Sequence, residues 1–391
     1  MKKLAIITTH PIQYNAPMFA MLHQRANIAL KVFYTWGDTV LKSKYDPGFN
    51  KAIEWDIPLL EGYEYEFLEN VSKKKGSHHY NGIINPDIIK KINEWRADVL
   101  LVYGWKFNSH LRVMRHFKNK IPVWFRGDST LLDEKKGLKS FFKTILLRWV
   151  YKHVDIAFFT GANNKEYFLH NGLKPYQLIK AFHAIDNERF QNIDSRYFLQ
   201  VEQLKTKLKI SPNSLIFLYA GKLESKKGVE NILNAFMAFK NKSTHLLIVG
   251  NGPEERKLKN LYSEVTNVTF LDFQNQMIMP VIYQLCDVYV LASTGPGESW
   301  GLSINEAMAA GKAILASDKC GGAVDLIVNG LNGFIFEAGN VADLTSKMQM
   351  LSESSMELAI MQQNSKELIQ RFTFMEFIYA IETRISNGNN S

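Results

Sequence analysis

Short runs of apolar, β-branched and aromatic residues recur along the chain and predict two series of β-strands. The first series reads LAIITT (4–9), LKVFY (30–34), DVLLVY (98–103), IPVWF (121–125), VDIAFFT (154–160) and LIKAF (178–182). The second reads SLIFLYA (214–220), HLLIVG (245–250), VTFLD (268–272), DVYVLA (287–292), KAILAS (312–317) and GFIFE (333–337). Helix-like stretches separate most of these runs. Strands that alternate with helices favour parallel sheets covered by helices on both faces.

The two series predict an α/β protein with two doubly wound, Rossmann-like domains that face each other across a cleft. A polar helical stretch at 192–208 separates the series, so we expect the first domain at 1–195 and the second at 196–370. Residues 371–391 are expected to form a C-terminal helix that packs back toward the first domain, followed by a polar tail. Ligands of open α/β sheets bind beyond the C-terminal strand ends, so the loops there are the places to look for chemistry.

Composition restricts the class of protein further. The chain has 391 residues, 46% hydrophobic and 22% charged, which is typical of a folded globular protein. No run approaches the roughly 18 apolar residues of a membrane-spanning helix. The first apolar run is too short for a signal peptide, and the two cysteines show no disulfide or zinc spacing. We therefore expect a cytoplasmic protein whose membrane contact, if any, is peripheral on the inner face of the cell membrane.

The positive charge is concentrated in the first half of the chain. Residues 1–190 hold 29 Lys and Arg against 18 Asp and Glu, whereas residues 191–391 hold 18 against 20. A basic half can meet nucleic acid, anionic lipid or a phosphorylated substrate, and an ordinary solvated surface explains it equally well.

Glycines and lysines follow the first strand of the second series, in GKLESKKG (221–228). Gly221 lets the backbone approach a ligand, Lys222 and Lys227 supply positive charge, and the next helix offers free N–H groups. This combination is typical of a diphosphate site, although a solvated lysine-rich turn has the same composition. The next strand ends in VGNGPEERKLK (249–259), where Gly252 belongs to a tight turn.

Two glutamates with seven residues between them occur in ESWGLSINE (298–306). Glu298 lies in a loop, and a helix is predicted to begin near Gly301 and Leu302 with its N–H groups toward the cleft. A carboxylate at a helix start can simply complement the helix dipole, but Glu306 is too deep in the helix for that role. Each carboxylate can accept two hydroxyl hydrogen bonds, which suits the vicinal diols of a sugar or ribose. If the helix extends far enough, both glutamates face the same side.

The order and spacing of GKLESKKG, VGNGPEERKLK, GESWGLSINEAMAAGKAILAS and GGAVDLIVNGLNGFIFEAGN resemble the C-terminal domain of retaining glycosyltransferases of family 4, which have the GT-B fold. The resemblance covers about 210–345. It implies that Glu298 contacts the donor sugar, Glu306 the ribose, and Lys222 and Lys227 the diphosphate. Ser299, Gly301, Leu302, Gly221 and Gly252 complete the implied donor site. Lys222 stands where an arginine is more usual, so the bidentate fork is lost.

The resemblance thins in the first half of the chain. The loop HPIQY resembles the acceptor side of a subgroup, which implies His10 and Gln13, although His10 can equally be a satisfied polar residue at a strand end. Family members often carry a histidine after the strand that here is IPVWF, but this chain reads WFRGDST instead. Arg126 is a candidate for steadying the leaving phosphate. Asp128 is an acceptor-side candidate, or else a cap of the following helix.

The stretch DEKKGLKSFFKTILLRWVYKHV (133–154) interleaves basic residues with aromatic and aliphatic ones. The basic residues are Lys135, Lys136, Lys139, Lys143, Arg148 and Lys152, and the apolar ones are Phe141, Phe142, Ile145, Leu146, Trp149 and Val150. An amphipathic helix of this composition suits an anionic membrane surface. A core-facing helix with solvated lysines is the alternative.

We therefore expect a retaining, metal-independent glycosyltransferase without a cofactor, whose co-substrate is a nucleoside diphosphate sugar. Its acceptor would be a lipid-linked or polysaccharide precursor, as in the biosynthesis of lipopolysaccharide and other cell-surface glycans, and we expect no nucleic-acid partner. The absence of any Asp-x-Asp or paired histidine spacing argues against a metal. The alternatives are a sugar-nucleotide epimerase or phosphorylase of the same fold, and a non-catalytic nucleotide- or polyanion-binding protein.

Overall fold

The computed structural model describes residues 1–38, 44–46, 48–135, 137–191 and 195–387. By its internal contacts the chain divides into two compact units. Unit 1 comprises 1–43, 58–182 and 374–391, and unit 2 comprises 44–57 and 183–373. The change of unit at 182–183 comes earlier than the expected boundary at 195–196, and the assignment of 44–57 to unit 2 has no counterpart in the expected domains.

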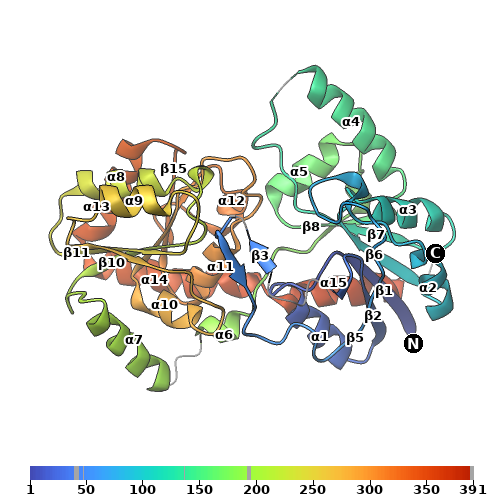
Figure 1. Ribbon diagram of the computed structural model, residues 1–391, viewed down its shortest axis with the longest axis horizontal. Helices are drawn as coiled ribbons and strands as arrows, with labels where there is room; N and C mark the ends of the chain where they lie inside the picture. The colour runs from blue at the N-terminus through green and yellow to red at the C-terminus, as the bar shows by residue number, and fades with distance from the viewer. Residues whose placement is uncertain (39–43, 47, 136, 192–194, 388–391) are drawn as a thin grey trace. The chain divides into compact units, whose positions relative to one another are not determined.

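Unit 1 is built on a parallel sheet with strand order β5-β2-β1-β6-β7-β8-β9 (Figure 1). The strands are β1 (Lys2–Thr8), β2 (Ile28–Tyr34), β5 (Glu64–Phe67), β6 (Val99–Tyr103), β7 (Val123–Arg126), β8 (Ile156–Phe159) and β9 (Leu178–Lys180). The helices are α1 (Ala16–Gln24), α2 (Ile88–Trp95), α3 (Asn108–Phe117), α4 (Leu138–Tyr151), α5 (Ala162–His170) and α15 (Phe374–Asn387). The central strands are apolar throughout because helices cover both faces of the sheet.

Unit 2 repeats this plan with strand order β12-β11-β10-β13-β14-β15, again parallel. The strands are β10 (Leu215–Ala220), β11 (Thr244–Val249), β12 (Val268–Leu271), β13 (Val288–Leu291), β14 (Ala313–Ser317) and β15 (Gly333–Phe336). The helices are α6 (Asn187–Gln191), α7 (Ser195–Lys207), α8 (Val229–Phe239), α9 (Glu255–Leu261), α10 (Met279–Leu285), α11 (Leu302–Ala309), α12 (Ala323–Leu326), α13 (Val341–Glu353) and α14 (Ser355–Leu368). The small antiparallel hairpin of β3 (Lys44–Asp46) and β4 (Lys51–Ile53) also belongs to this unit.

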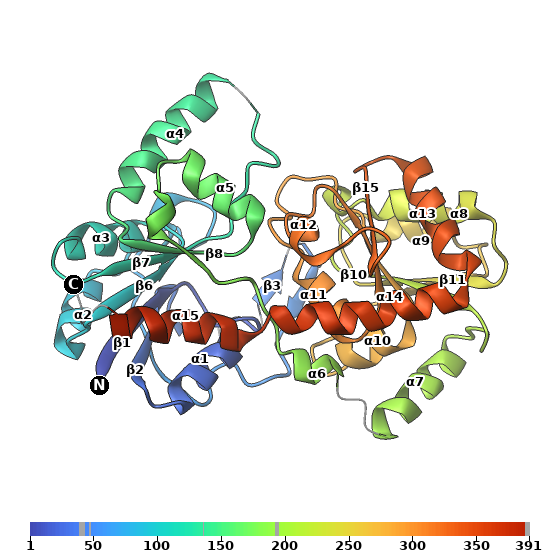
Figure 2. The ribbon, with the colours of Figure 1, turned by 180° about the vertical axis from the view of Figure 1, so that it is seen from behind.

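The last helix, α15, packs on unit 1 although it follows unit 2 in the sequence (Figure 2). Glu382 accepts hydrogen bonds from Arg25 Nε and Nη2, at 2.8 and 2.9 Å, and the Arg25 guanidinium lies 5.1 Å from the ring centroid of Tyr379. Phe377 contacts Phe158 of β8. These contacts tie the end of the described chain to the first helix and to the sheet of unit 1.

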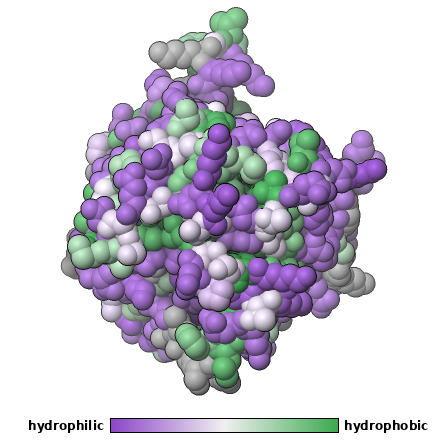
Figure 3. Space-filling model, turned by 90° about the vertical axis from the view of Figure 1, so that its left-hand side faces the viewer, coloured by the Kyte–Doolittle hydropathy of each residue, from purple (hydrophilic) through white to green (hydrophobic). Residues whose placement is uncertain are grey.

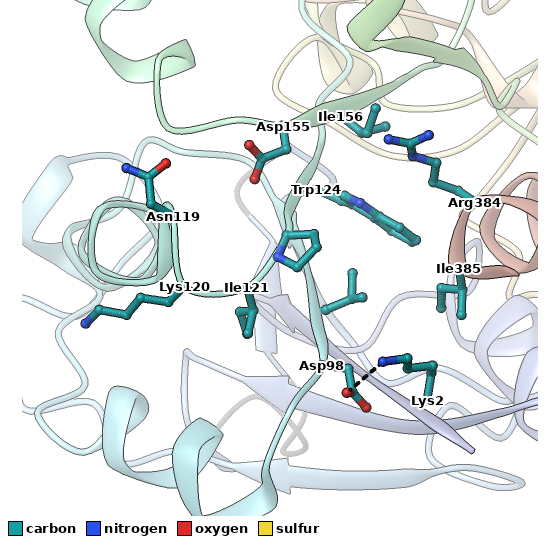
Figure 4. A pocket seen from close by; sticks show the side chains of 12 residues that line it. Lys2, Asp98, Asn119, Lys120, Ile121, Trp124, Asp155, Ile156, Arg384 and Ile385 are labelled. Atoms are coloured by element: carbon teal, nitrogen blue, oxygen red, sulfur yellow. Dashed lines mark hydrogen bonds and ion pairs between the residues drawn. The ribbon is translucent and has the colours of Figure 1, made fainter. Parts of the chain in front are cut away.

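A cavity of about 460 Å³ lies at the N-terminal ends of the unit 1 strands (Figure 4). Two aspartates in its lining accept hydrogen bonds from backbone N–H groups at the beginning of strands. Asp98 accepts the backbone N–H of Lys3, and Asp155 accepts that of Val123, each at 2.8 Å. This is the sheet edge opposite to the one where ligands of open α/β sheets bind, so the cavity does not mark the catalytic site.

Candidate active site

Three loops of unit 2 meet with their backbones in contact at the C-terminal ends of its strands. A Cβ atom on Gly250 would lie 2.0 Å from the carbonyl oxygen of Gly221, and one on Gly228 would lie 2.1 Å from that of Ala292. Gly228 also has a φ of +66°, which glycine adopts at little cost. Gly252 approaches the backbone of Leu223 in the same way. Gly228, Gly250 and Gly252 are therefore needed where backbone meets backbone, whereas a Cβ atom on Gly221 would meet the Tyr219 side chain.

Glu298 and Lys227, two residues predicted from different motifs, form an ion pair. Ser293, just after β13, donates its hydroxyl hydrogen to the same carboxylate oxygen at 2.9 Å. The side chains of Glu298 and Lys227 are 14% and 22% exposed, so both remain reachable from solvent. Ser293 was not predicted from the sequence, although a small polar residue at the end of a strand was an available signal.

The loop that carries Glu298 is held by a second loop, after β14. The backbone N–H of Gly321 donates to the carbonyl of Glu298 at 2.9 Å, and that of Gly322 donates to Trp300 at 2.8 Å. A Cβ atom on Gly321 would lie 2.0 Å from the carbonyl oxygen of Ser299. Ser299 thus lies where the two loops touch, and the backbone around Glu298 is fixed on both sides.

Helix α11 begins at Leu302 with Gly301 as its N-cap, in agreement with the sequence prediction. Glu306 lies in its second turn, is only 3% exposed, and accepts a hydrogen bond from the Tyr283 hydroxyl at 2.8 Å. Glu298 precedes the helix, so the condition under which both glutamates would share one helical face is not met. Tyr283 was missed because it lies on α10, 23 residues earlier, and nothing local marks it.

Lys222 is held by a carboxylate that the sequence analysis did not consider. Its Nζ lies 3.0 Å from both Asp46 Oδ1 and Asp46 Oδ2, and 5.1 Å from the ring centroid of Phe49. Burial disfavours the ionised form of Asp46, but the bonds from Lys222 and from two backbone N–H groups outweigh it and lower the pKa of Asp46. Both candidate diphosphate lysines are therefore paired with carboxylates of the same unit.

The segment that carries Asp46 is anchored across unit 2 by its backbone and aromatic side chains. Phe49 packs on Phe273, with ring centroids 4.9 Å apart. Further along the segment, the side-chain amide of Asn275 donates to the carbonyl of Glu54 at 2.6 Å, and the backbone N–H of Met277 donates to Asp56. We call residues 44–57 the strap.

In unit 1 the sequence-predicted residues are His10, Gln13, Arg126 and Asp128. His10 Nδ1 is hydrogen-bonded to Thr9 Oγ1 at 2.8 Å, and its ring meets Trp36 edge-on. Gln13 is half-buried just before α1, and Asp128 is exposed. The first helix after Asp128 is α4, which begins ten residues later with Gly137 as its N-cap. The interpretation of Asp128 as a helix cap is therefore wrong.

Arg126 is buried rather than presented to a ligand. It is 5% exposed, its Nη1 donates to the carbonyl of Ala181 at 2.8 Å, and its guanidinium lies 4.2 Å from the ring centroid of Phe377. Burial lowers the pKa of Arg126 below its usual value. The side chain joins the end of β7 to the segment after β9 and to α15, which leaves the phosphate role without structural support.

His110 is a second buried polar side chain of unit 1, and the sequence analysis did not single it out. Its Nδ1 lies 2.9 Å from the carbonyl oxygen of Gly104, and its Nε2 lies 2.9 Å from Thr35 Oγ1. Burial lowers the pKa of His110 to about 4. The ring is neutral near pH 7 and connects the loops that follow β2 and β6.

Among the residues that the structure describes, no group of three or more His, Cys, Asp or Glu is arranged to hold a metal ion. No helix among the same residues is long and apolar enough to cross a bilayer.

The protein has two parallel, doubly wound sheets, and glycine-rich loops that bear carboxylates lie on the second. This is the GT-B fold of glycosyltransferases. Residues 200–368, all within unit 2, match the family described as glycosyl transferases group 1.

Individual relatives are similar to this chain over somewhat more than half of its length. An uncharacterized glycosyltransferase of Methanocaldococcus jannaschii is 24% identical over 244 residues, which are 60% of this chain and 59% of the relative. The N,N'-diacetylbacillosaminyl-diphospho-undecaprenol alpha-1,3-N-acetylgalactosaminyltransferase of Campylobacter jejuni is 29% identical over 240 residues, 56% of this chain and 60% of the relative. This chain thus matches about three fifths of the length of each.

Among solved structures, Anabaena HepE in complex with UDP superposes with a TM-score of 0.73 and 18% identity. The superposition covers 99% of this chain and 100% of that one. At this level of identity the likeness concerns the fold.

Proposed function

We propose that the protein is a retaining, metal-independent glycosyltransferase. It would move a hexose-type sugar from a nucleoside diphosphate sugar to a hydroxyl of a lipid-linked or polysaccharide precursor in cell-surface glycan biosynthesis. The observation that carries the proposal is the Lys227–Glu298 pair, which Ser293 supports and which directly precedes the start of α11. A cation, a carboxylate and a helix N-terminus thus occur together at the C-terminal edge of a parallel sheet.

Each of these groups suits one part of the donor. As the bond between the anomeric carbon and the β-phosphate oxygen breaks, its electron pair goes to the phosphate. Lys222, Lys227 and the first N–H groups of α11 would stabilise that charge, which is often the largest single contribution to catalysis. Glu298 would accept hydrogen bonds from sugar hydroxyls. The acceptor oxygen then bonds to the same face of the sugar, and its proton passes to the departing phosphate oxygen.

Glu306 is proposed to bind the ribose diol. Its Oε2 accepts a hydrogen bond from the Tyr283 hydroxyl, which would orient the carboxylate toward the ribose hydroxyls. With only 3% of the residue exposed, such a bond would be well shielded from water and correspondingly strong.

Different relatives support the proposed donor and the proposed acceptor. The HepE structure contains UDP, which favours a nucleoside diphosphate donor here. The name of the Campylobacter enzyme includes a diphospho-undecaprenol acceptor, which favours a lipid-linked acceptor. On this proposal the enzyme works in the cytoplasm, at the inner face of the cell membrane.

The donor site is tested by thermal unfolding with UDP, GDP, ADP and CMP. We expect one nucleoside diphosphate at millimolar concentration to raise the Tm by several degrees, since a ligand at ~100 times its Kd stabilises by about 2.7 kcal/mol. The Glu306→Ala variant should lose most of this shift. If none of the four nucleotides raises the Tm of the wild type, the donor-site proposal is overturned.

Catalysis is tested with the Glu298→Gln variant, which keeps the shape of the side chain and removes its charge. Sugar transfer or slow donor hydrolysis should fall at least ~100-fold, as expected when a positioned electrostatic group is lost. Glu264→Gln, a neutralised carboxylate on the exposed surface of the same unit, should leave the rate unchanged. Equal turnover in both variants would mean that Glu298 does not act in catalysis. No turnover in the wild type would favour a binding protein, and conversion of the donor to its epimer without release of the nucleoside diphosphate would favour an epimerase.

A further inference from the structure

Helix α4 exposes most of its large apolar side chains. Leu138, Phe141, Phe142, Ile145, Leu146 and Trp149 are 79%, 61%, 65%, 50%, 46% and 39% exposed, respectively. Soluble proteins expose single apolar residues routinely, but a contiguous group of this size marks an interaction surface. The face shown in Figure 3, by contrast, has hydrophobic residues scattered among hydrophilic ones. We call the six side chains the outer face of α4.

The outer face is a continuous stripe because of the helical repeat. At 100° per residue its six side chains fall within an arc of about 140°. The opposite side of the helix carries Leu147, Val150 and Tyr151, which are buried in the core of unit 1. Tyr151 stacks edge-on against Phe168 there. The helix is therefore already docked by its inner face, and the outer face is not part of the fold's core.

Positive charge borders the stripe on both sides. Residues 135–152 contain six Lys and Arg and no acidic residue. By the same helical repeat, Lys139 flanks one edge and Arg148 the other, while Lys152 follows the last turn; all three are exposed. Arg115 adds a further cation, 5.5 Å from the ring centroid of Trp149. Lys143 is paired with Glu134 at 3.3 Å, and Lys136 lies outside the described residues.

The position of the helix suits a planar partner. Figures 1 and 2 both show α4 projecting from unit 1, with its N-terminal end far from the sheet. A stripe of Phe, Leu and Ile with a Trp near one end and cations on its borders matches an interfacial helix, whose apolar side enters the lipid while its cations meet headgroups. A protein partner would need acidic side chains opposite the cations on both borders of the helix. An anionic bilayer presents negative headgroups at every point of its surface.

We propose that the outer face of α4 docks the protein on an anionic membrane surface, with the helix lying in the plane of the interface. Membrane binding requires only this helix and its bordering cations. The proposed function enters in one respect: it supplies the reason for docking, because a lipid-linked acceptor would lie in that membrane. The sequence also allowed a core-facing helix with solvated lysines. That alternative explains the buried inner face of α4 but not the exposed apolar side chains of its outer face.

The test is sedimentation with vesicles of phosphatidylcholine alone and of phosphatidylcholine with one quarter phosphatidylglycerol. We expect the wild type to bind the anionic vesicles at least ~10-fold more tightly than the neutral ones, and less so as salt is raised. Phe141→Ser with Phe142→Ser should weaken binding to anionic vesicles at least ~10-fold, since two rings no longer enter the lipid. Lys139→Glu with Lys152→Glu should remove the preference for anionic lipid.

A matched control lies in unit 2, where Phe198 and Leu199 of α7 are likewise adjacent and 63% and 60% exposed. Phe198→Ser with Leu199→Ser should leave vesicle binding unchanged. Equal loss in both double variants, or no binding by the wild type, would overturn the proposal. So would a wild type that sediments without lipid as a dimer and becomes monomeric only in the α4 variant, because the outer face would then join two copies.

The proposed function is judged separately. The α4 double variant should keep the Tm shift produced by the nucleoside diphosphate, because none of the donor-site residues lies in unit 1. Nucleotide binding without vesicle binding would refute only the membrane proposal, and vesicle binding without nucleotide binding would refute only the donor site.

Discussion

The two units share one sheet plan but join their strand-end loops by different means. In unit 2 the loops touch through backbone, at Gly228, Gly250 and Gly321, where a Cβ atom would lie 2.0 to 2.1 Å from a carbonyl oxygen, far inside van der Waals contact. In unit 1 buried polar side chains do the joining, through His110 and Arg126. Backbone contact leaves amide groups and charged side chains available for a ligand. Side-chain bridges use those groups up, and a titratable bridge makes the loops sensitive to pH.

The largest expected effect comes from breaking a backbone contact in unit 2. Gly228 and Gly104 have similar φ values, +66° and +73°, but only Gly228 has a carbonyl oxygen 2.1 Å from the position of a Cβ atom. Gly104→Ala should cost about 1 kcal/mol for the left-handed backbone alone. Gly228→Ala should cost about 3 kcal/mol or more, because backbone must also move. Urea unfolding of both variants measures the difference, and equal losses would contradict the backbone-contact account.

A smaller effect is expected from titrating the bridge of unit 1. The pKa of His110 is about 4 in the folded protein, below the usual 6.5, so the unfolded chain binds more protons between these pH values. The stabilisation is complete above pH 6.5 and is lost as the pH falls toward 4, by at most about 3 kcal/mol.

Urea unfolding between pH 7.5 and 4.5 should therefore show a shallower fall in stability for His110→Gln than for the wild type. His78→Gln, at an exposed position of the same unit, serves as the control and should follow the wild type. Parallel curves for all three proteins would show that the bridge does not titrate in this range.

The smallest effect concerns the pairing of Lys222. Asp46→Asn removes the charge that faces Lys222 and should tighten the binding of the stabilising nucleoside diphosphate about threefold, since a half-exposed ion pair contributes at most about 1 kcal/mol. Asp56→Asn neutralises another carboxylate of the strap that bonds to Met277 instead. Calorimetric titration of both variants decides the matter: weaker binding to Asp46→Asn would mean that the carboxylate helps to hold the donor.

The strand pattern made most of the fold predictable, because buried parallel strands are apolar along their whole length. The run DVYVLA (287–292), for example, contains β13, Val288–Leu291. Strand β5 reads EYEF and was missed, since its charged residues lie at the edge of the sheet, where Lys31 and Lys91 pair with them. Edge strands need not be apolar, so periodicity does not reveal them.

The candidate site was predictable only where its residues belong to local motifs. Glu298, Lys227 and the start of α11 were found because glycines and a helix start mark their loops. Asp46 and Tyr283 were not, since each reaches its partner across a long sequence separation, 176 residues in the case of Asp46 and Lys222. Arg126 was misjudged for the opposite reason: its position after a strand is correct for a ligand contact, but α15 returns from the far end of the chain to cover it.

The strap limits where genes for proteins of this kind can recombine without separating residues that pair. The chain changes unit at 43–44, 57–58, 182–183 and 373–374, so no single cut separates the two. A recombinant that exchanged everything after residue 183 between two relatives would join one parent's Asp46 and Phe49 to the other parent's Lys222 and Phe273. Residues 44–57 would then have to travel with the second half of the gene to keep these pairs together, even though they are encoded within the first.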